Sequence, residues 1–265
     1  MTWWQAAILG LIQGIAEFLP ISSSGHLVLG QYLLGLKTTG GVTFEVFVHF
    51  GTVLSIVTVY YARIGRILKE AFTFRDFEQR YHENEDYRFA VFILITLVAT
   101  GIIYLLFGEQ LEALFESPRF VCGMLLVTGL LLLLTLFRRN PEGDLNPLKV
   151  VLIGVAQGAA LTPGISRSGA TICTALYQGV ENRKAADFSF LMSLPAIVGA
   201  TAISAIEVWQ KGTSTSVVVL LVGTLVAYAS GVLAIRWMID LVSRGHLHYF
   251  AFYVFLAGGL GLYFI

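Results

Sequence analysis

The sequence predicts an all-α polytopic membrane protein, and its composition and apolar patterning carry this prediction. Of the 265 residues, 56% are apolar and only 13% are charged, whereas an average soluble domain is about 25% charged. The mean hydropathy is +0.77. Apolar residues fill whole stretches of about 20 residues, the length that a membrane helix needs, and do not alternate as in a membrane barrel. A soluble globular domain and a disordered chain are therefore excluded.

The charges and the cysteines exclude further classes of protein. The 17 basic residues are balanced by 17 acidic ones, so the chain offers no basic patch for a nucleic acid. Cys122 and Cys173 both lie within apolar stretches, which predicts small buried hydrophobes and not a disulfide framework. The first basic residue is Lys37, so we expect no cleaved signal peptide.

Eight apolar stretches follow one another along the chain. Six are uninterrupted and predict one transmembrane helix each: residues 42–61, 89–107, 120–137, 185–206, 217–235 and 247–265. The other two, residues 3–36 and 148–180, are each interrupted by a short polar segment next to a proline. Such an interrupted stretch either crosses the membrane once or turns back as a re-entrant hairpin.

The distribution of Lys and Arg favours two hairpins, because basic residues gather in cytoplasmic loops. If both interrupted stretches turn back, 13 basic residues share one side, Lys37, Arg119 and Lys211 share the other, and Arg167 lies inside. If both cross once, the division is only 10 to 6. The 13 residues are Arg63, Arg66, Lys69, Arg75, Arg80, Arg88, Arg138, Arg139, Lys149, Arg183, Lys184, Arg236 and Arg244. We therefore expect both termini outside the cytoplasm and the loop 62–88 inside it.

An offset of 144 residues superimposes the two interrupted stretches without a gap. Eight positions are then identical: Gly10, Gln13, Gly14, Ala16, Ile21, Ser22, Ser24 and Gly25 fall on Gly154, Gln157, Gly158, Ala160, Ile165, Ser166, Ser168 and Gly169. Three spans separate the two stretches, so the second enters from the opposite side. The sequence predicts a single membrane domain, residues 1–265, with an inverted-topology repeat. Each half, about 1–145 and 146–265, contains one re-entrant helical hairpin plus three transmembrane helices, a device by which many transporters build a midplane site.

The first polar segment carries groups that are costly in a membrane. Gln13 and Glu17 are four residues apart and therefore share one helix face. A run of serines and His26 follow within ten residues of Glu17. Ionisable residues inside a membrane are functional by default, so we expect this segment to form part of a site.

The second polar segment adds a cation to that site. Arg167 carries a planar guanidinium that suits phosphate oxygens. Hydroxyl residues surround it at the start of a new helix, where free backbone N–H groups attract anions. Together the two segments predict a phosphate site with an acid–base pair beside it.

The two segments also carry a family resemblance over essentially the whole chain. Glu-Phe-Leu-Pro-Ile-Ser-Ser-Ser-Gly-His at residues 17–26 and Pro-Gly-Ile-Ser-Arg-Ser-Gly-Ala-Thr at residues 163–171 resemble the two signature motifs of the undecaprenyl-diphosphatase family, the BacA/UppP bacitracin-resistance proteins. The resemblance implies a phosphatase of the bacterial cytoplasmic membrane that hydrolyses undecaprenyl diphosphate on the extracytoplasmic side. It also implies dependence on a divalent cation, Mg²⁺ or Ca²⁺, for which Glu17 is the candidate ligand. The family often has Glu where this chain has Gln13, which leaves acid–base work to Glu17.

On this basis each residue is assigned a role. Arg167 and backbone N–H groups hold the diphosphate; Ser23 or His26 attacks the terminal phosphorus, and Glu17 and His26 handle the protons. The residues expected to bind substrate are Gln13, Ser22, Ser24, Ser166, Ser168 and Thr171. For the four serines among them, a role as helix caps is an equal alternative.

Three alternatives stay open at this point. A lipid-carrier transporter or flippase would also use an inverted repeat, although pure transport has little use for Glu17 beside His26. Glu45 and His49, four residues apart, are interpreted as a structural hydrogen-bonded pair, because no third metal ligand accompanies them. The run Gly258-Gly259-Leu260-Gly261 indicates close helix packing, which leaves a homodimer open.

Overall fold

A computed structural model describes residues 1–36, 41–72, 77–138, 142–211 and 215–264. Every secondary-structure element named within these ranges is a helix: α1 (Trp3–Ala16), α2 (Ser23–Leu33), α3 (Gly41–Ala71), α4 (Phe77–Glu83), α5 (Glu85–Ala113), η2 (Leu114–Glu116), α6 (Pro118–Leu134), η3 (Thr135–Phe137), α7 (Pro147–Ala159), α8 (Arg167–Tyr177), α9 (Asn182–Lys211), α10 (Val217–Ser243) and α11 (Tyr249–Phe264). The prediction of an all-α fold is confirmed.

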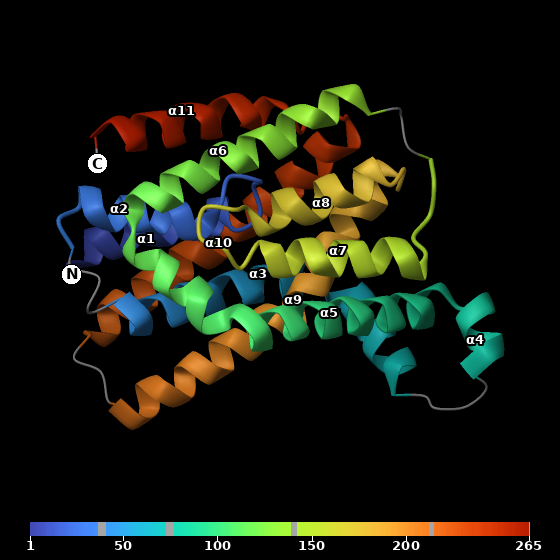
Figure 1. Ribbon diagram of the computed structural model, residues 1–265. Coiled ribbons are helices and arrows are strands. Elements are labelled where there is room, and N and C mark those ends of the chain that lie inside the picture. Colours follow the sequence, from blue (N-terminus) through green and yellow to red (C-terminus); the bar gives the residue numbers. More distant parts are fainter. Residues whose placement is uncertain (37–40, 73–76, 139–141, 212–214, 265) are drawn as a thin grey trace.

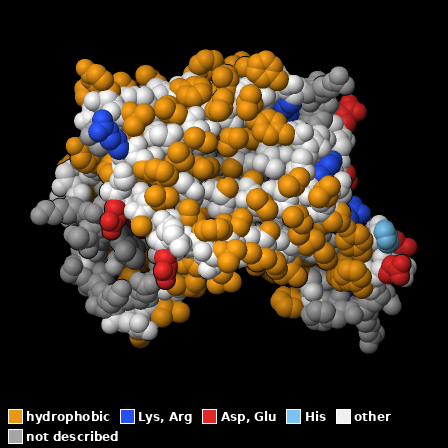
Figure 2. All heavy atoms as spheres, in the orientation of Figure 1, with side chains coloured by type: hydrophobic (Ala, Val, Ile, Leu, Met, Phe, Trp, Pro, Cys, Tyr) orange, Lys and Arg blue, Asp and Glu red, His pale blue; other side chains and the backbone are white. Residues whose placement is uncertain are grey.

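Five of these helices are long and apolar enough to cross a membrane: Thr43–Ala71, Glu85–Leu111, Pro118–Phe137, Asn182–Gln210 and Val217–Ser243. Apolar side chains cover most of the face in Figure 2, and the charged side chains on that face lie toward the two ends. In a soluble protein such a surface would be an aggregation liability; in lipid it is the required exterior. The chain is a multi-pass membrane protein.

The sixth predicted span is shorter than expected. The sequence predicts a crossing over residues 247–265, but α11 has 16 residues between Tyr249 and Phe264, and Ile265 lies outside the described residues. The helix starts late because Gly245 adopts φ 77° and ends α10, after which a turn leads into Tyr249. At 1.5 Å per residue, α11 spans about 24 Å, less than the roughly 30 Å of a bilayer core.

Both interrupted stretches turn back on themselves. In Figure 1, α1 runs from the end that holds both termini to the centre and α2 returns to that end, whereas α7 and α8 do the same from the opposite end. The two turns meet in the middle of the molecule (Figure 1). Helix α7 begins where Asn146 caps the amide of Lys149 and Pro147 occupies the first turn, a typical helix start.

Glycines let the hairpin helices lie close to their neighbours. A Cβ on Gly10 would lie 2.5 Å from the carbonyl oxygen of Gly223 on α10, and one on Gly154 would lie 2.9 Å from Thr96 Cα on α5. The predicted packing role is confirmed for Gly258, where a Cβ would lie 2.8 Å from the carbonyl oxygen of Cys122, and for Gly261, but not for Gly259, where a Cβ would have no atom within 4 Å. Backbone contact of this kind is how membrane helices associate.

The charged loop lies opposite the termini. Figure 1 shows α4, within the loop 62–88, at the far end of the molecule from both chain ends. This is the relative placement that the distribution of basic residues predicts, although Lys37, Arg75 and Arg139 lie outside the described residues.

Candidate functional site

A cavity of about 360 Å³ lies where the two hairpin turns meet. Side chains from both hairpins and from α3, α5 and α9 line it, and we call the polar ones the polar wall. The polar lining residues are Glu17, Ser22, Ser23, Ser24, Glu45, His49, Thr100, Gln157, Arg167, Ser193, Thr201 and Ser204, and the apolar ones include Phe115, Ala196, Ile197 and Ala200. An apolar pocket with a few convergent polar groups is the usual form of a ligand site.

Glu17 is the centre of the polar wall. Its Oε1 accepts from Arg167 Nη2, which joins the first hairpin to the second. Its Oε2 accepts from Ser23 Oγ at 2.7 Å and from Gln13 Nε2 at 3.0 Å. The structure therefore brings together Glu17, Ser23 and Arg167, three of the four residues predicted to be catalytic.

Arg167 keeps a donor for a ligand. Its Nη1 is buried and has no hydrogen-bond partner among the described residues, although Nη2 is bound to Glu17. Leaving a buried polar group unpaired costs about 1–3 kcal/mol, and more for a charged one. An anion in the cavity would satisfy Nη1, because a guanidinium only donates.

The turn before α2 is strained where it presents Ser23. Ser22 adopts φ 70°, a left-handed conformation that is unfavourable for a residue with a Cβ. Its Oγ caps the amide of Gly25 at 3.3 Å, and Ser23 follows as the first residue of α2. Strain of this kind is concentrated at functional sites, and here it aims Ser23 Oγ at Glu17.

The hydroxyls of the second hairpin are buried and hold the two turns together. Ser166 Oγ caps the amide of Gly169 at 3.1 Å, so the capping alternative is confirmed for it as for Ser22. Ser168 Oγ donates to the carbonyl of Leu19 at 3.0 Å, and Thr171 Oγ1 lies 2.6 Å from Ser189 Oγ. The structure places Ser166, Ser168 and Thr171 behind the cavity wall, where they support Arg167.

Gln13 also lies behind the wall. It is fully buried, and its amide supports the carboxylate of Glu17. Its sequence position predicts contact with substrate, but its side chain is held against the Glu17 carboxylate and does not line the cavity. Of the residues predicted to bind substrate, Ser22 and Ser24 line the cavity.

His26 is turned away from the cavity. Its Nδ1 lies 2.8 Å from the carbonyl oxygen of Ser22, and its Nε2 lies 2.9 Å from Tyr253 Oη on α11. The two rings are stacked with centroids 5.5 Å apart. The sequence led us to expect His26 beside Glu17. The structure does not bring them together, because the first turn of α2 directs His26 toward α11.

Sequence reasoning missed seven polar residues of the cavity: Glu45, His49, Thr100, Gln157, Ser193, Thr201 and Ser204. The sequence indicates only a structural pair for Glu45 and His49, but both line the cavity, and His49 Nε2 lies 4.0 Å from Glu17 Oε2. Gln157 and Thr100 also line it, joined by a hydrogen bond of 3.0 Å. Gln157 carries a signal in the sequence, since it is the counterpart of Gln13 at the offset of 144; Thr100 carries none.

The described residues do not form a metal centre. No three His, Cys, Asp or Glu side chains within the described ranges gather as a ligand set. Both oxygens of Glu17, the predicted ligand, are already bound by Arg167, Ser23 and Gln13. Ca²⁺ takes six to eight oxygen ligands and Mg²⁺ an octahedron, which is more than these side chains supply by themselves; the cation dependence that the family resemblance implies stays a prediction.

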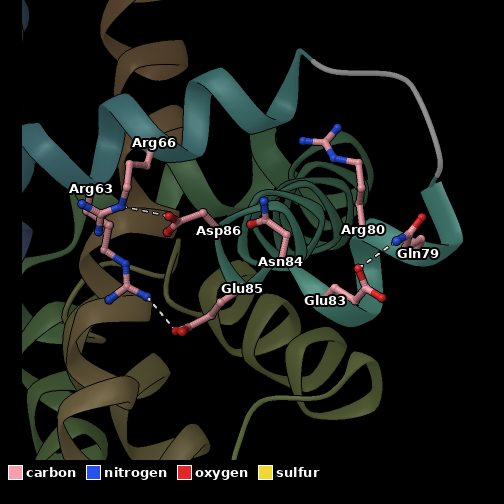
Figure 3. Close-up of a pocket in the computed structure, with 8 residues that line it drawn as sticks. All are labelled: Arg63, Arg66, Gln79, Arg80, Glu83, Asn84, Glu85 and Asp86. Atoms are coloured by element: carbon pink, nitrogen blue, oxygen red, sulfur yellow. Dashed lines mark hydrogen bonds and ion pairs between the residues drawn. The ribbon is translucent and has the colours of Figure 1, made fainter.

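A larger hollow, about 720 Å³, lies between the end of α3, α4 and the start of α5 (Figure 3). Its charged groups neutralise one another: Arg66 Nε lies 2.9 Å from Asp86 Oδ2, and Arg63 Nη2 lies 3.4 Å from Glu85 Oε1. Exposed ion pairs of this kind contribute little to stability and offer a ligand no convergent donors. We therefore assign the site to the smaller cavity.

Fold and site together define an integral membrane protein that holds a carboxylate, a hydroxyl and a guanidinium in one cavity at the meeting point of two helical hairpins. The family model "Bacitracin resistance protein BacA" matches residues 6–260, and the chain belongs to this family. It is 56% identical to an undecaprenyl-diphosphatase of Salinibacter ruber over 99% of both chains. It is 38% identical to one of Bacteroides thetaiotaomicron over 97% of both, and to one of Halothermothrix orenii over 97% of this chain and 96% of that one.

Proposed function

We propose that this chain hydrolyses undecaprenyl diphosphate to undecaprenyl phosphate and inorganic phosphate, and so returns the lipid carrier to peptidoglycan synthesis. The observation that carries the proposal is the contact of Glu17 with both Ser23 and Arg167 inside an intramembrane cavity. Membership of the BacA family and the names of its relatives support the same activity.

Arg167 binds the diphosphate. Its unpartnered Nη1 donates to a phosphate oxygen while Nη2 stays on Glu17, so the guanidinium holds substrate and carboxylate in a fixed relation. As negative charge shifts during phosphoryl transfer, a preorganised cation in a site of low dielectric stabilises it.

Ser23 is the nucleophile. A protonated hydroxyl is a weak nucleophile and needs an adjacent base. Glu17 Oε2, 2.7 Å from Ser23 Oγ, is that base. Ser23 Oγ bonds to the terminal phosphorus while its proton passes to Glu17. The bond from that phosphorus to the bridging oxygen breaks, and undecaprenyl phosphate leaves with the electron pair.

The membrane position suits a lipid substrate. Phe115, Ile197 and small apolar residues also line the cavity, and the helices around it carry an apolar exterior. The diphosphate binds to the polar wall of the cavity, while the polyprenyl chain stays in apolar surroundings. We place the protein in the cytoplasmic membrane with its site on the extracytoplasmic side, as the family resemblance implies; the distribution of basic residues puts both termini on that same side.

The inverted repeat is part of this proposal. Helix α1 packs against α10 as α7 packs against α5, and α2 follows α1 as α8 follows α7. The pair Ser22–Ser24, with Oγ atoms 3.3 Å apart, has its counterpart in Ser166–Ser168 at 3.2 Å. These matched contacts, at an offset of 144 residues, support one ancestral unit present twice in opposite orientations.

Phosphate release from undecaprenyl diphosphate by the purified chain in detergent tests the function. Transport has no meaning in micelles, so release by the wild type with loss in Ser23→Ala supports the phosphatase. A wild-type chain that binds the lipid but releases no phosphate, with or without added Mg²⁺ or Ca²⁺, would overturn it. The two cation arms also test the cation dependence that the family resemblance implies.

A further inference from the structure

The two histidines near the hairpin turn differ in what their rings can still bind. Both nitrogens of His26 are engaged, Nδ1 near the carbonyl of Ser22 and Nε2 near Tyr253 Oη. His49 lies on α3, and its Nδ1 lies 2.8 Å from the carbonyl oxygen of Glu45. Its Nε2 is turned to Glu17, and its side chain, one-third exposed, lines the cavity.

The hydrogen bond to Glu45 fixes which ring nitrogen of His49 carries the hydrogen. A carbonyl oxygen only accepts, so Nδ1 is the donor and a neutral ring keeps its lone pair on Nε2. That lone pair is directed into the cavity beside Glu17. Glu45 is itself held, because its Oε1 accepts from Gln31 Nε2 at 3.0 Å.

The separation of His49 from Glu17 leaves room for a water. Nε2 lies 4.0 Å from Glu17 Oε2, which is too long for a hydrogen bond. A polar contact beyond about 3.5 Å is a place where a water bridges. Such a water would lie next to the carboxylate that holds Ser23.

We propose that His49 accepts the proton of the water that completes the reaction. The inference rests on the proposed function, in which Ser23 becomes phosphorylated. The oxygen of the water bonds to phosphorus as its proton passes to His49 Nε2. The bond between phosphorus and Ser23 Oγ breaks, Oγ recovers the proton that Glu17 took in the first step, and phosphate leaves.

Chemical rescue tests this role in the full-length chain in detergent. His49→Ala should lower kcat roughly 10²–10⁴-fold, the usual contribution of a general acid or base. Because only the second step is slowed, KM should fall with kcat, and kcat/KM for the lipid should stay near that of wild type. Undecaprenyl phosphate should then appear in a rapid burst of one equivalent per chain, followed by a slow phase. Imidazole added to His49→Ala should raise the slow rate at least tenfold, since it enters the space left by the ring.

Two matched variants separate proton transfer from structure. His49→Gln fills the space and cannot take a proton, so it should be slow and insensitive to imidazole. His82→Ala, an exposed histidine on α4, should behave as wild type. A His49→Ala rate within threefold of wild type, or a loss with neither burst nor rescue, would overturn the role of His49 while leaving the phosphatase intact. An inactive wild-type chain would instead overturn the function on which the inference rests.

Discussion

Arg167 on the second hairpin is ion-paired to Glu17 on the first, although 150 residues separate them in the sequence. Both side chains are largely buried, at 17% and 6% exposure. Removing one member of a buried ion pair leaves an uncompensated charge and is strongly destabilising. The pair therefore holds the two hairpin turns together as well as serving the reaction, and substitutions must be chosen to separate the two roles.

Arg167→Lys keeps the positive charge and removes the planar guanidinium with its two donors, Nη1 and Nη2. A single ammonium cannot present two donors in the fixed geometry that Nη1 and Nη2 provide. We expect kcat/KM to fall by the equivalent of about 1.5–3 kcal/mol, the scale of one charge-assisted hydrogen bond. Phosphate release from undecaprenyl diphosphate measures it, with thermal unfolding as the control for folding. Activity within twofold of wild type would show that Arg167 does not bind the phosphate.

Glu17 and Ser23 are expected to act as one unit. Glu17→Gln keeps the size of the side chain and removes the base, so the rate should fall roughly 10²–10⁴-fold. Ser23→Ala should be at least as damaging, and the double variant should be little worse than either single one. If the rate losses of the two single variants multiplied in the double variant, the two residues would act independently, which would contradict the activation of Ser23 by Glu17.

Close packing of α1 on α10 should be sensitive to a single methyl group. A Cβ on Gly14 would lie 2.0 Å from Ser230 Oγ and 2.4 Å from the carbonyl oxygen of Ala227. Overpacking costs about 1–3 kcal/mol, so Gly14→Ala should unfold at lower temperature in detergent. Gly65→Ala is the control, because its Cβ would have no atom within 4 Å. Equal unfolding temperatures would mean that α1 shifts without cost.

The fold was predictable because its signals are local. Long apolar runs define the spans, and the polar breaks at Pro20 and Pro163 define the hairpins. The length of α11 was not predictable, since its start depends on how the backbone turns at Gly245. Leu247 and His248, the first two residues of the predicted span, lie in the turn before α11, so the predicted span is longer than the helix.

The site was predictable in part. Glu17, Ser23 and Arg167 lie in short motifs whose chemistry can be read directly. It could not be foreseen that His49, and not His26, lies beside Glu17, because this depends on the direction in which each ring leaves its helix. His26 is close to Glu17 along the chain but faces α11, whereas His49 reaches Glu17 only because α3 packs beside the first hairpin.

His26 and Tyr253 should stabilise the protein more than they serve the reaction. Tyr253→Phe removes the hydrogen bond to His26 and keeps the stacked ring, so we expect a loss of about 0.5–1.5 kcal/mol in stability. Thermal unfolding in detergent measures this loss, and kcat should stay within threefold of wild type. His26→Gln combined with Glu17→Gln should give multiplied losses. If Tyr253→Phe instead slowed turnover roughly 10²-fold, the scale of a lost general acid or base, the pair would belong to the reaction after all.

The side of the membrane on which the charged loop lies can be tested with cysteines at the two ends of the molecule. Cys122 and Cys173 are buried and unpaired, so background labelling by a membrane-impermeant maleimide should be low. Glu83→Cys lies next to α5 at the end that carries Arg63, Arg66 and Arg80, whereas Thr2→Cys lies at the end of the termini. Because basic residues stay in the cytoplasm, intact cells should label Thr2→Cys only, and permeabilised cells should label both. Labelling of Glu83→Cys in intact cells would invert the orientation that the distribution of basic residues predicts.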